Sequence, residues 1–124
     1  MKKKIGIILS LLLMASLGFG QNHSDSEVLR FVSEYERVAT QYNNVVNSID
    51  SMVNTGNTDG IERMLNQCKN IEMQANNIQA KTPFYQDEIV ANEAYTNRIL
   101  RATEKISTAA ARLENIIRFK LPQL

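Results

Sequence analysis

The sequence has 124 residues and a net charge of +1, and it contains one cysteine, one histidine and no tryptophan. One cysteine permits no disulfide within the chain, and a single histidine removes most routes to general-base catalysis or metal binding. The length suits one modest domain rather than two.

The first twenty residues have the three parts of a secretory signal peptide. Lysines occupy positions 2–4, residues 5–20 carry no charge, and Gly18 and Gly20 place small side chains just before Gln21. As a helix the uncharged run rises about 24 Å, which is less than the roughly 30 Å hydrocarbon core of a bilayer. We therefore expect residues 1–20 to be a cleavable signal peptide, with an uncleaved signal anchor as the alternative.

Removal of that leader leaves a domain over residues 21–124 with 11 basic and 13 acidic side chains, or a net charge of −2. This balance does not favour nucleic acid or anionic lipid as a general partner. Glycine and proline are rare after the leader, which favours an all-helical domain. Export, with the periplasm favoured over the medium, is the expected destination.

A first helix is expected over residues 25–54. Its apolar positions repeat by seven in three rows, which together form a stripe wide enough to face two neighbouring helices. The rows are Val28, Tyr35, Tyr42 and Ile49; Phe31, Val38, Val45 and Met52; and Val32, Ala39, Val46 and Val53. Ser24 and Glu27 form a capping-box pattern before the helix, and Gly56 is placed to end it.

A second helix is expected over residues 59–81, capped by Thr58 or Asp59. Its apolar stripe is the narrowest of the three. Its other faces carry seven carboxamides, namely Asn66, Gln67, Asn70, Gln74, Asn76, Asn77 and Gln79.

A third helix is expected over residues 84–120, with Thr82 as its N-cap and Pro83 in its first turn. Ile99, Ile106 and Leu113 repeat by seven along it. Three helices joined by short turns predict an all-α, antiparallel up-down-up three-helix bundle with coiled-coil-like heptad seams. Pairing of the same heptads between chains, as a coiled-coil oligomer, is the alternative.

No constellation for catalysis or cofactor binding is found in the sequence. The only histidine, His23, precedes the first helix, and no Glu-x-x-His or Cys-x-x-Cys-His motif occurs. We therefore expect no enzymatic activity, no cofactor and no metal. Cys68 falls on the apolar stripe of the second helix and is interpreted as a core residue, with an intermolecular disulfide as the alternative.

Tyr35 and Tyr42 occupy seam positions of the first helix. We interpret them as core residues whose hydroxyls reach the edge of the bundle. Alternatively, together with Phe84 and Tyr85 they mark an aromatic binding patch.

A basic stripe runs along the third helix, where Arg98, Lys105 and Arg112 repeat by seven and Arg101 lies one turn from Arg98. Residues 98–120 carry a net charge of +4, whereas residues 21–97 carry −6. One interpretation is that acidic residues such as Glu27 and Glu34 on the first helix pair with the stripe. The other is that Arg98, Arg101, Lys105 and Arg112 bind an acidic or phosphate-bearing partner.

These observations predict an exported, non-enzymatic helical-bundle protein of the bacterial cell envelope that acts by protein–protein binding. Its docking face would be the basic stripe or an apolar groove beside the narrow second helix. In organisation the chain is similar to periplasmic chaperones and to small helical subunits of bacterial secretion machines. The alternatives are an amphipathic membrane-active protein and a homo-oligomeric structural coiled coil.

Overall fold

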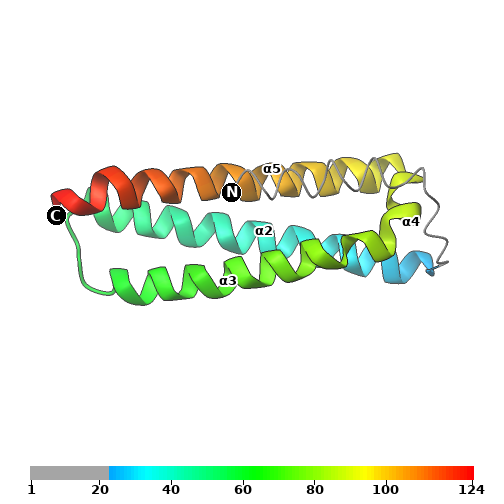
Figure 1. Ribbon diagram of the computed structural model, residues 1–124, viewed down its shortest axis with the longest axis horizontal. Helices are drawn as coiled ribbons and strands as arrows, with labels where there is room; N and C mark the ends of the chain where they lie inside the picture. The colour runs from blue at the N-terminus through cyan, green and yellow to red at the C-terminus, as the bar shows by residue number, and fades with distance from the viewer. Residues whose placement is uncertain (1–22) are drawn as a thin grey trace.

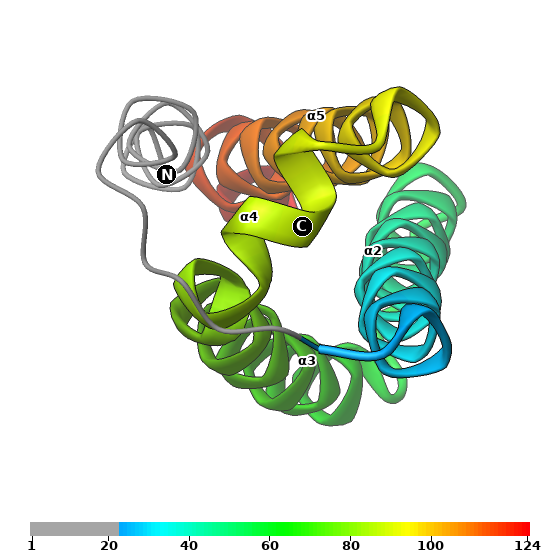
Figure 2. The same ribbon diagram turned by 90° about the vertical axis from the view of Figure 1, so that its right-hand side faces the viewer.

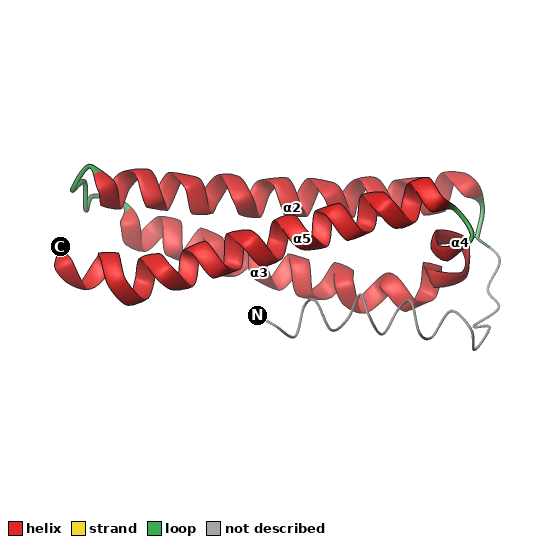
Figure 3. Cartoon of the chain, turned by 90° about the horizontal axis from the view of Figure 1, so that it is seen from above, coloured by secondary structure: helices red, strands yellow, loops and turns green. Residues whose placement is uncertain are grey.

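The computed structural model describes residues 23–124, so the expected signal peptide lies outside the described residues. Three long antiparallel helices make up the fold, α2 (Asp25–Asn54), α3 (Ile61–Lys81) and α5 (Glu93–Asn115), as Figures 1 and 3 show. The all-α, up-down-up three-helix bundle expected from the sequence is confirmed.

α2 is the central helix of the bundle, because it packs closely along both α3 and α5. Seen along the bundle axis, the three helices surround a common core (Figure 2). The α2 residues that fill this core are those of the heptad rows, apart from the half-buried Met52. A stripe of three rows on one helix therefore supplies two seams, as its width predicts.

Both ends of α2 are fixed by local hydrogen bonds. At its start, the Ser24 hydroxyl accepts a bond from the Glu27 backbone N–H at 3.3 Å. At its end, Gly56 adopts a φ of 72°, and its N–H donates to the Val53 carbonyl while the Asn57 N–H donates to the Met52 carbonyl. This Schellman pattern needs a left-handed residue, which glycine adopts without strain.

The start of α3 differs from the expected one. Neither Thr58 nor Asp59 caps the helix; Gly60, with a φ of 81°, precedes Ile61 and offers no side chain. The Asp59 N–H instead donates to the Asn57 side chain at 3.2 Å. This bond lies within the turn and does not cap the helix. The helix therefore begins at Ile61 rather than at residue 59.

The expected continuous helix over residues 84–120 is interrupted. The chain passes from α3 through a 3-10 turn, η2 (Thr82–Tyr85), into the short helix α4 (Gln86–Val90), which crosses the end of the bundle (Figure 2). Thr82 is not an N-cap, because it is buried and its hydroxyl donates to the Ile78 carbonyl. Asn92 is the N-cap of α5, since its side chain accepts from the Tyr95 N–H at 3.2 Å.

The chain ends in a π-helical turn, η3 (Ile116–Lys120), and a 3-10 turn, η4 (Leu121–Gln123), close to the α2–α3 loop (Figure 1). Within residues 23–124 none of the helices combines the length and apolar content needed to cross a bilayer.

Candidate functional site

The basic stripe of α5 is partly used to hold α2. Arg98 forms a bidentate pair with Glu36, with its Nε 3.0 Å from Oε2 and its Nη2 2.5 Å from Oε1, and it also contacts Ser33. The hydrogen bond from Arg98 lowers the pKa of the Glu36 carboxyl. This pair bridges the seam from α5 to α2.

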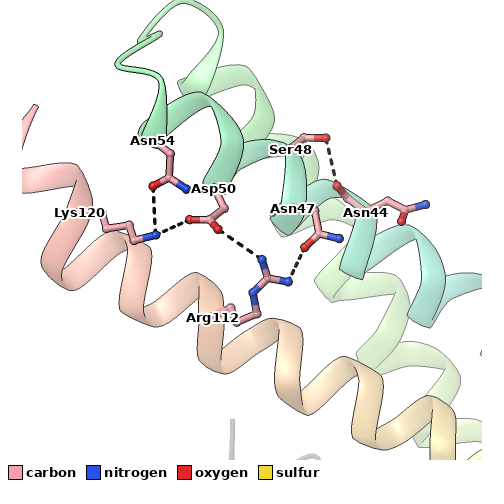
Figure 4. Close-up of polar contacts among 7 residues, drawn as sticks. All are labelled: Asn44, Asn47, Ser48, Asp50, Asn54, Arg112 and Lys120. Atoms are coloured by element: carbon pink, nitrogen blue, oxygen red, sulfur yellow. Dashed lines mark hydrogen bonds and ion pairs between the residues drawn. The ribbon is translucent and has the colours of Figure 1, made fainter.

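A second polar cluster closes the same seam near the C-terminus (Figure 4). Arg112 donates to Asn47 and lies 3.4 Å from an Asp50 carboxylate oxygen. Lys120 donates to the other Asp50 oxygen at 2.7 Å and to Asn54 at 3.2 Å. The Lys120 ammonium, followed by the Arg112 guanidinium, lowers the pKa of Asp50.

The stripe is therefore divided in two. Arg98 and Arg112 contact α2, whereas Arg101 and Lys105 are exposed, and Arg101 donates to the Asn97 carbonyl of its own helix. The expected ion pairing with α2 is found, but with Glu36 and Asp50 in place of Glu27 and Glu34. The acidic residues in the sequence of α2 predict that this helix pairs with the basic stripe. They do not predict which turn of α2 faces each basic residue.

The two seam tyrosines are core residues, as the sequence predicts, but their hydroxyls do not reach the edge of the bundle. The Tyr35 hydroxyl lies 2.5 Å from the Thr103 hydroxyl and accepts a bond from the Gln79 amide at 3.1 Å. Burial raises the pKa of Tyr35, and burial also raises that of Tyr42. Because both are fully buried and Phe84 is exposed, these residues form no common aromatic patch.

Cys68 is buried with 1% of its surface exposed, which confirms its interpretation as a core residue. Within residues 23–124, no three His, Cys, Asp or Glu side chains converge as metal ligands would.

A groove runs along the outer edge of the α2–α3 seam and has two hollows. The first, of about 630 Å³, lies beside the first turns of α2 and the last turns of α3. The second, of about 490 Å³, lies nearer the middle of both helices. Gln74 lines both hollows, so the two are adjacent along α3.

Six carboxamides line this groove, and we call them the groove carboxamides; in the first hollow they lie beside the charged side chains of Glu27, Arg30, Glu34 and Lys81. They are Gln41 and Asn44 on α2 and Gln67, Asn70, Gln74 and Asn77 on α3. All six are exposed, and none of their side chains forms a hydrogen bond within residues 23–124. The floor is apolar and nearly closed, since Val38, Ile71 and Ile78 are only 2%, 6% and 6% exposed.

An aromatic cluster closes one end of the groove. The Phe31 and Tyr85 rings stack with centroids 4.5 Å apart, and the His23 ring lies 4.5 Å from that of Tyr85. Both the backbone N–H and the ring of His23 contact one carboxylate oxygen of Glu88, at 2.8 and 3.1 Å. Although burial opposes it, these bonds hold the pKa of Glu88 below its usual value.

Sequence reasoning places the docking groove beside the narrow helix α3 but expects it to be apolar. Its α3 side carries amides because the carboxamides on α3 at positions 67, 70, 74 and 77 recur by three and four, which places them on one face. That spacing is visible in the sequence, whereas the contribution of α2 depends on how the helices pack.

Comparison of the chain with protein-family models, with curated proteins and with solved structures gives no match. The fold defines the chain as an all-α three-helix bundle, and the groove and the basic stripe are its candidate sites.

Proposed function

We propose that this protein is an exported, non-enzymatic binding protein of the bacterial cell envelope, and that a protein partner docks in the α2–α3 groove. The observation that carries the proposal is the set of six groove carboxamides, which line two adjacent hollows and have no hydrogen-bond partner within residues 23–124. Each carboxamide offers two donors and an acceptor, so the groove presents a dense array of polar groups to a ligand.

The groove is favoured over the basic stripe because the stripe is already engaged. An acidic partner that docked on Arg98 would have to displace its bidentate pair with Glu36, and one on Arg112 would have to displace Asn47 and Asp50. Arg101 and Lys105 remain exposed as the smaller, secondary candidate surface. No comparable displacement is needed in the groove.

Affinity capture with matched variants tests the proposal. The tagged chain, exported and processed in its own cells, is recovered from the envelope fraction and its partners are identified by mass spectrometry. The variant Asn70→Arg/Gln74→Arg fills the groove with long charged side chains. The variant Asn66→Arg/Asn76→Arg makes the same change on exposed positions of α3 that lie outside the groove, and it is the control.

Loss of a stoichiometric partner in the groove variant, with retention in the control, supports the proposal. Retention by both, with loss in Arg101→Glu/Lys105→Glu, would assign the partner to the stripe and contradict the groove. Circular dichroism of each variant establishes that the bundle remains folded.

A homo-oligomer is the second candidate, favoured by the C-terminal end of the bundle. Ile117, Phe119 and Leu124 are 47%, 59% and 52% exposed within the last eight residues. Exposed apolar side chains gathered in one segment favour contact with another protein surface. Sedimentation of the chain and of Phe119→Ser tests this: a mass that rises with concentration, and falls in the variant, would support self-assembly.

A further inference from the structure

We propose that η2 and α4 together, residues 82–90, form a lid that opens and closes over one end of the bundle core, and that His23 is its latch. The segment crosses the end of the bundle between α3 and α5 (Figure 2). Its buried side carries an unpaired polar group, its outer side exposes apolar rings and chains, and side-chain contacts at its edges hold it in place.

The buried side of the lid is polar. Gln86 of α4 is fully buried, and neither its side-chain oxygen nor its nitrogen has a hydrogen-bond partner among residues 23–124. Gln79, two residues before the end of α3, is also fully buried, and its side-chain oxygen is unpaired in that same part of the chain. Buried amides are nearly always paired in folded proteins, so an unpaired one destabilises the closed arrangement. Opening removes this penalty for Gln86, because water reaches its amide when α4 moves away from the core.

The outer side of the lid is partly apolar. Phe84 of η2 and Val90 of α4 are 60% and 38% exposed, whereas Ile89 of α4 is buried in the core. Burial of apolar side chains is the main source of packing stability. A segment that buries a glutamine and exposes a phenylalanine therefore gains less from its position than the long helices gain from theirs. Regions that bury little apolar surface are those that open independently of the rest of a protein.

Contacts at its edges hold the lid closed. At the C-terminal end of α4, the Thr96 hydroxyl of α5 donates to the Ile89 carbonyl at 2.7 Å. On the opposite edge, the backbone N–H and the ring of His23 both contact one oxygen of Glu88, and the same ring lies beside that of Tyr85. One residue just before α2 therefore contacts both parts of the lid, which is why we assign His23 as the latch.

Opening of the lid changes the first hollow of the groove. Tyr85 lines that hollow, and its ring stacks on Phe31, which lines the hollow from α2. When η2 moves away, this stack separates and the closed end of the groove opens. The lid itself does not depend on the proposed function, whereas its effect on binding in the groove does.

Native-state hydrogen exchange of the whole processed chain, followed by NMR in dilute urea, tests the lid. The reporters are the N–H groups of Ala91 and Asn92, which donate to the Asp87 and Ile89 carbonyls of α4 at 3.0 and 3.1 Å, and we call them the lid amides. We expect them to exchange faster than the amides in the middle of α2. Dilute urea should barely change their rate, because the opening of a lid exposes little new surface.

Three variants separate opening of the lid from unfolding of the bundle. Ile106→Val is the control, because Ile106 is fully buried about 20 Å along α5 from its first residue. It should speed exchange in the middle of α2 by about fivefold and leave the lid amides unchanged. Gln86→Leu replaces the unpaired amide at nearly the same volume, so exchange of the lid amides should slow by about tenfold. His23→Ala removes the ring contacts but keeps the backbone bond, and should speed exchange of the lid amides by about fivefold.

Three results would overturn the proposal. If Ile106→Val speeds exchange of the lid amides as much as that of α2, the segment opens only when the whole bundle unfolds. If Gln86→Leu speeds their exchange, the Gln86 amide is paired by buried water in the closed state and does not favour opening. If His23→Ala leaves their exchange unchanged, His23 is not the latch. None of these measurements requires a partner, so the lid can fail while affinity capture still supports the proposed function, and the reverse.

Discussion

α2 meets α5 along a seam edged by ion pairs, whereas it meets α3 beside an open groove lined by six exposed carboxamides. The buried Tyr35 hydroxyl bonds across both seams. On the α5 side, Arg98 and Arg112 extend across the seam to acidic side chains of α2. On the α3 side, the groove carboxamides point to solvent and form no hydrogen bonds within residues 23–124. The apolar rows of α2 form the core of both seams. The two seams therefore differ in the polar side chains along their edges.

The polar groups at the α2–α5 edge hold the helices together, whereas those at the α2–α3 edge remain available to a ligand. Polar groups that bridge two helices fix how those helices pack, and a ligand can reach them only by breaking the bridge. Polar groups that contact only water can be exchanged for ligand groups at little cost. The two seams should therefore respond differently to substitution.

The largest effect is expected from deleting buried side chains, and its size should differ between the seams. Ile106 of α5 is fully buried, whereas Ile71 of α3 is 6% exposed and lines the second hollow. We expect Ile106→Ala to reduce the free energy of unfolding by about 4 kcal/mol and Ile71→Ala by about 2 kcal/mol, because side chains beside an open groove can relax into the space. Urea unfolding followed by circular dichroism measures both.

Leu29→Ala is the control for this pair, because Leu29 is 41% exposed on α2. Its effect should be below that of either core variant. An Ile71→Ala loss as large as that of Ile106→Ala would show that the two seams are equally rigid and would remove the contrast.

Tyr35→Phe should have the next largest effect, because it removes the hydroxyl that links all three helices. Thr103 keeps its bond to the Ile99 carbonyl, but the buried Gln79 amide loses its acceptor. A buried polar group left unpaired lowers the free energy of unfolding by about 1–3 kcal/mol. The double variant Tyr35→Phe/Gln79→Leu should recover part of the loss in the same unfolding measurement. If the double variant is less stable than Tyr35→Phe, the Gln79 amide is not the group that is left unpaired.

Gln79 also marks a limit of sequence reasoning. It lies among seven carboxamides of the α3 segment, and composition gives no reason to separate it from Gln67 or Gln74. In the bundle it is fully buried and donates to Tyr35, whereas Gln67 and Gln74 line the groove. Helical periodicity predicts which positions share a face, but only the packing angle decides where the buried stripe ends.

The regular parts of the fold were the predictable ones. α2 has the bounds expected from its heptads and its Ser24 cap, since these signals are local and agree with one another. The corner after α3 was not predictable, because Thr82 and Pro83 form a helix-start pattern that the chain uses in a turn. The N-cap of the third long helix, α5, is Asn92. Its position at the start of α5 depends on α4, which crosses the end of the bundle just before it.

Acidification should weaken the α2–α5 seam more than the α2–α3 seam. The pKa values of Glu36 and Asp50 are lowered in the folded state, by Arg98 and Lys120 respectively, from usual values of 4.5 and 3.8. A lowered folded-state pKa means that the stabilisation is fully present above the unfolded value and is lost as pH falls through the folded value. The pairs are partly exposed, so each contributes about 0.5–1 kcal/mol.

Thermal melting of the wild type and of Glu36→Gln, followed between neutral pH and pH 3, checks this expectation. The two curves should differ above the usual pKa of Glu36, 4.5, and converge as pH falls below it. A difference that persists undiminished at the acid end would mean that Arg98 stabilises the seam by packing rather than by charge.

Substitutions of the groove carboxamides should change the free energy of unfolding least. A small change would indicate that these side chains are not needed for folding. Asn70 and Asn77 are exposed and lack hydrogen bonds within the described chain, so Asn70→Leu/Asn77→Leu should change the free energy of unfolding by no more than about 0.5 kcal/mol. Leucine also forms helices more readily than asparagine, which biases the change towards stabilisation. Urea unfolding beside the control Asn66→Leu/Asn76→Leu measures it. A loss above about 1 kcal/mol would show that the carboxamides stabilise the α2–α3 seam. Unchanged stability, together with loss of the captured partner in the same variant, would show that they serve binding and not folding.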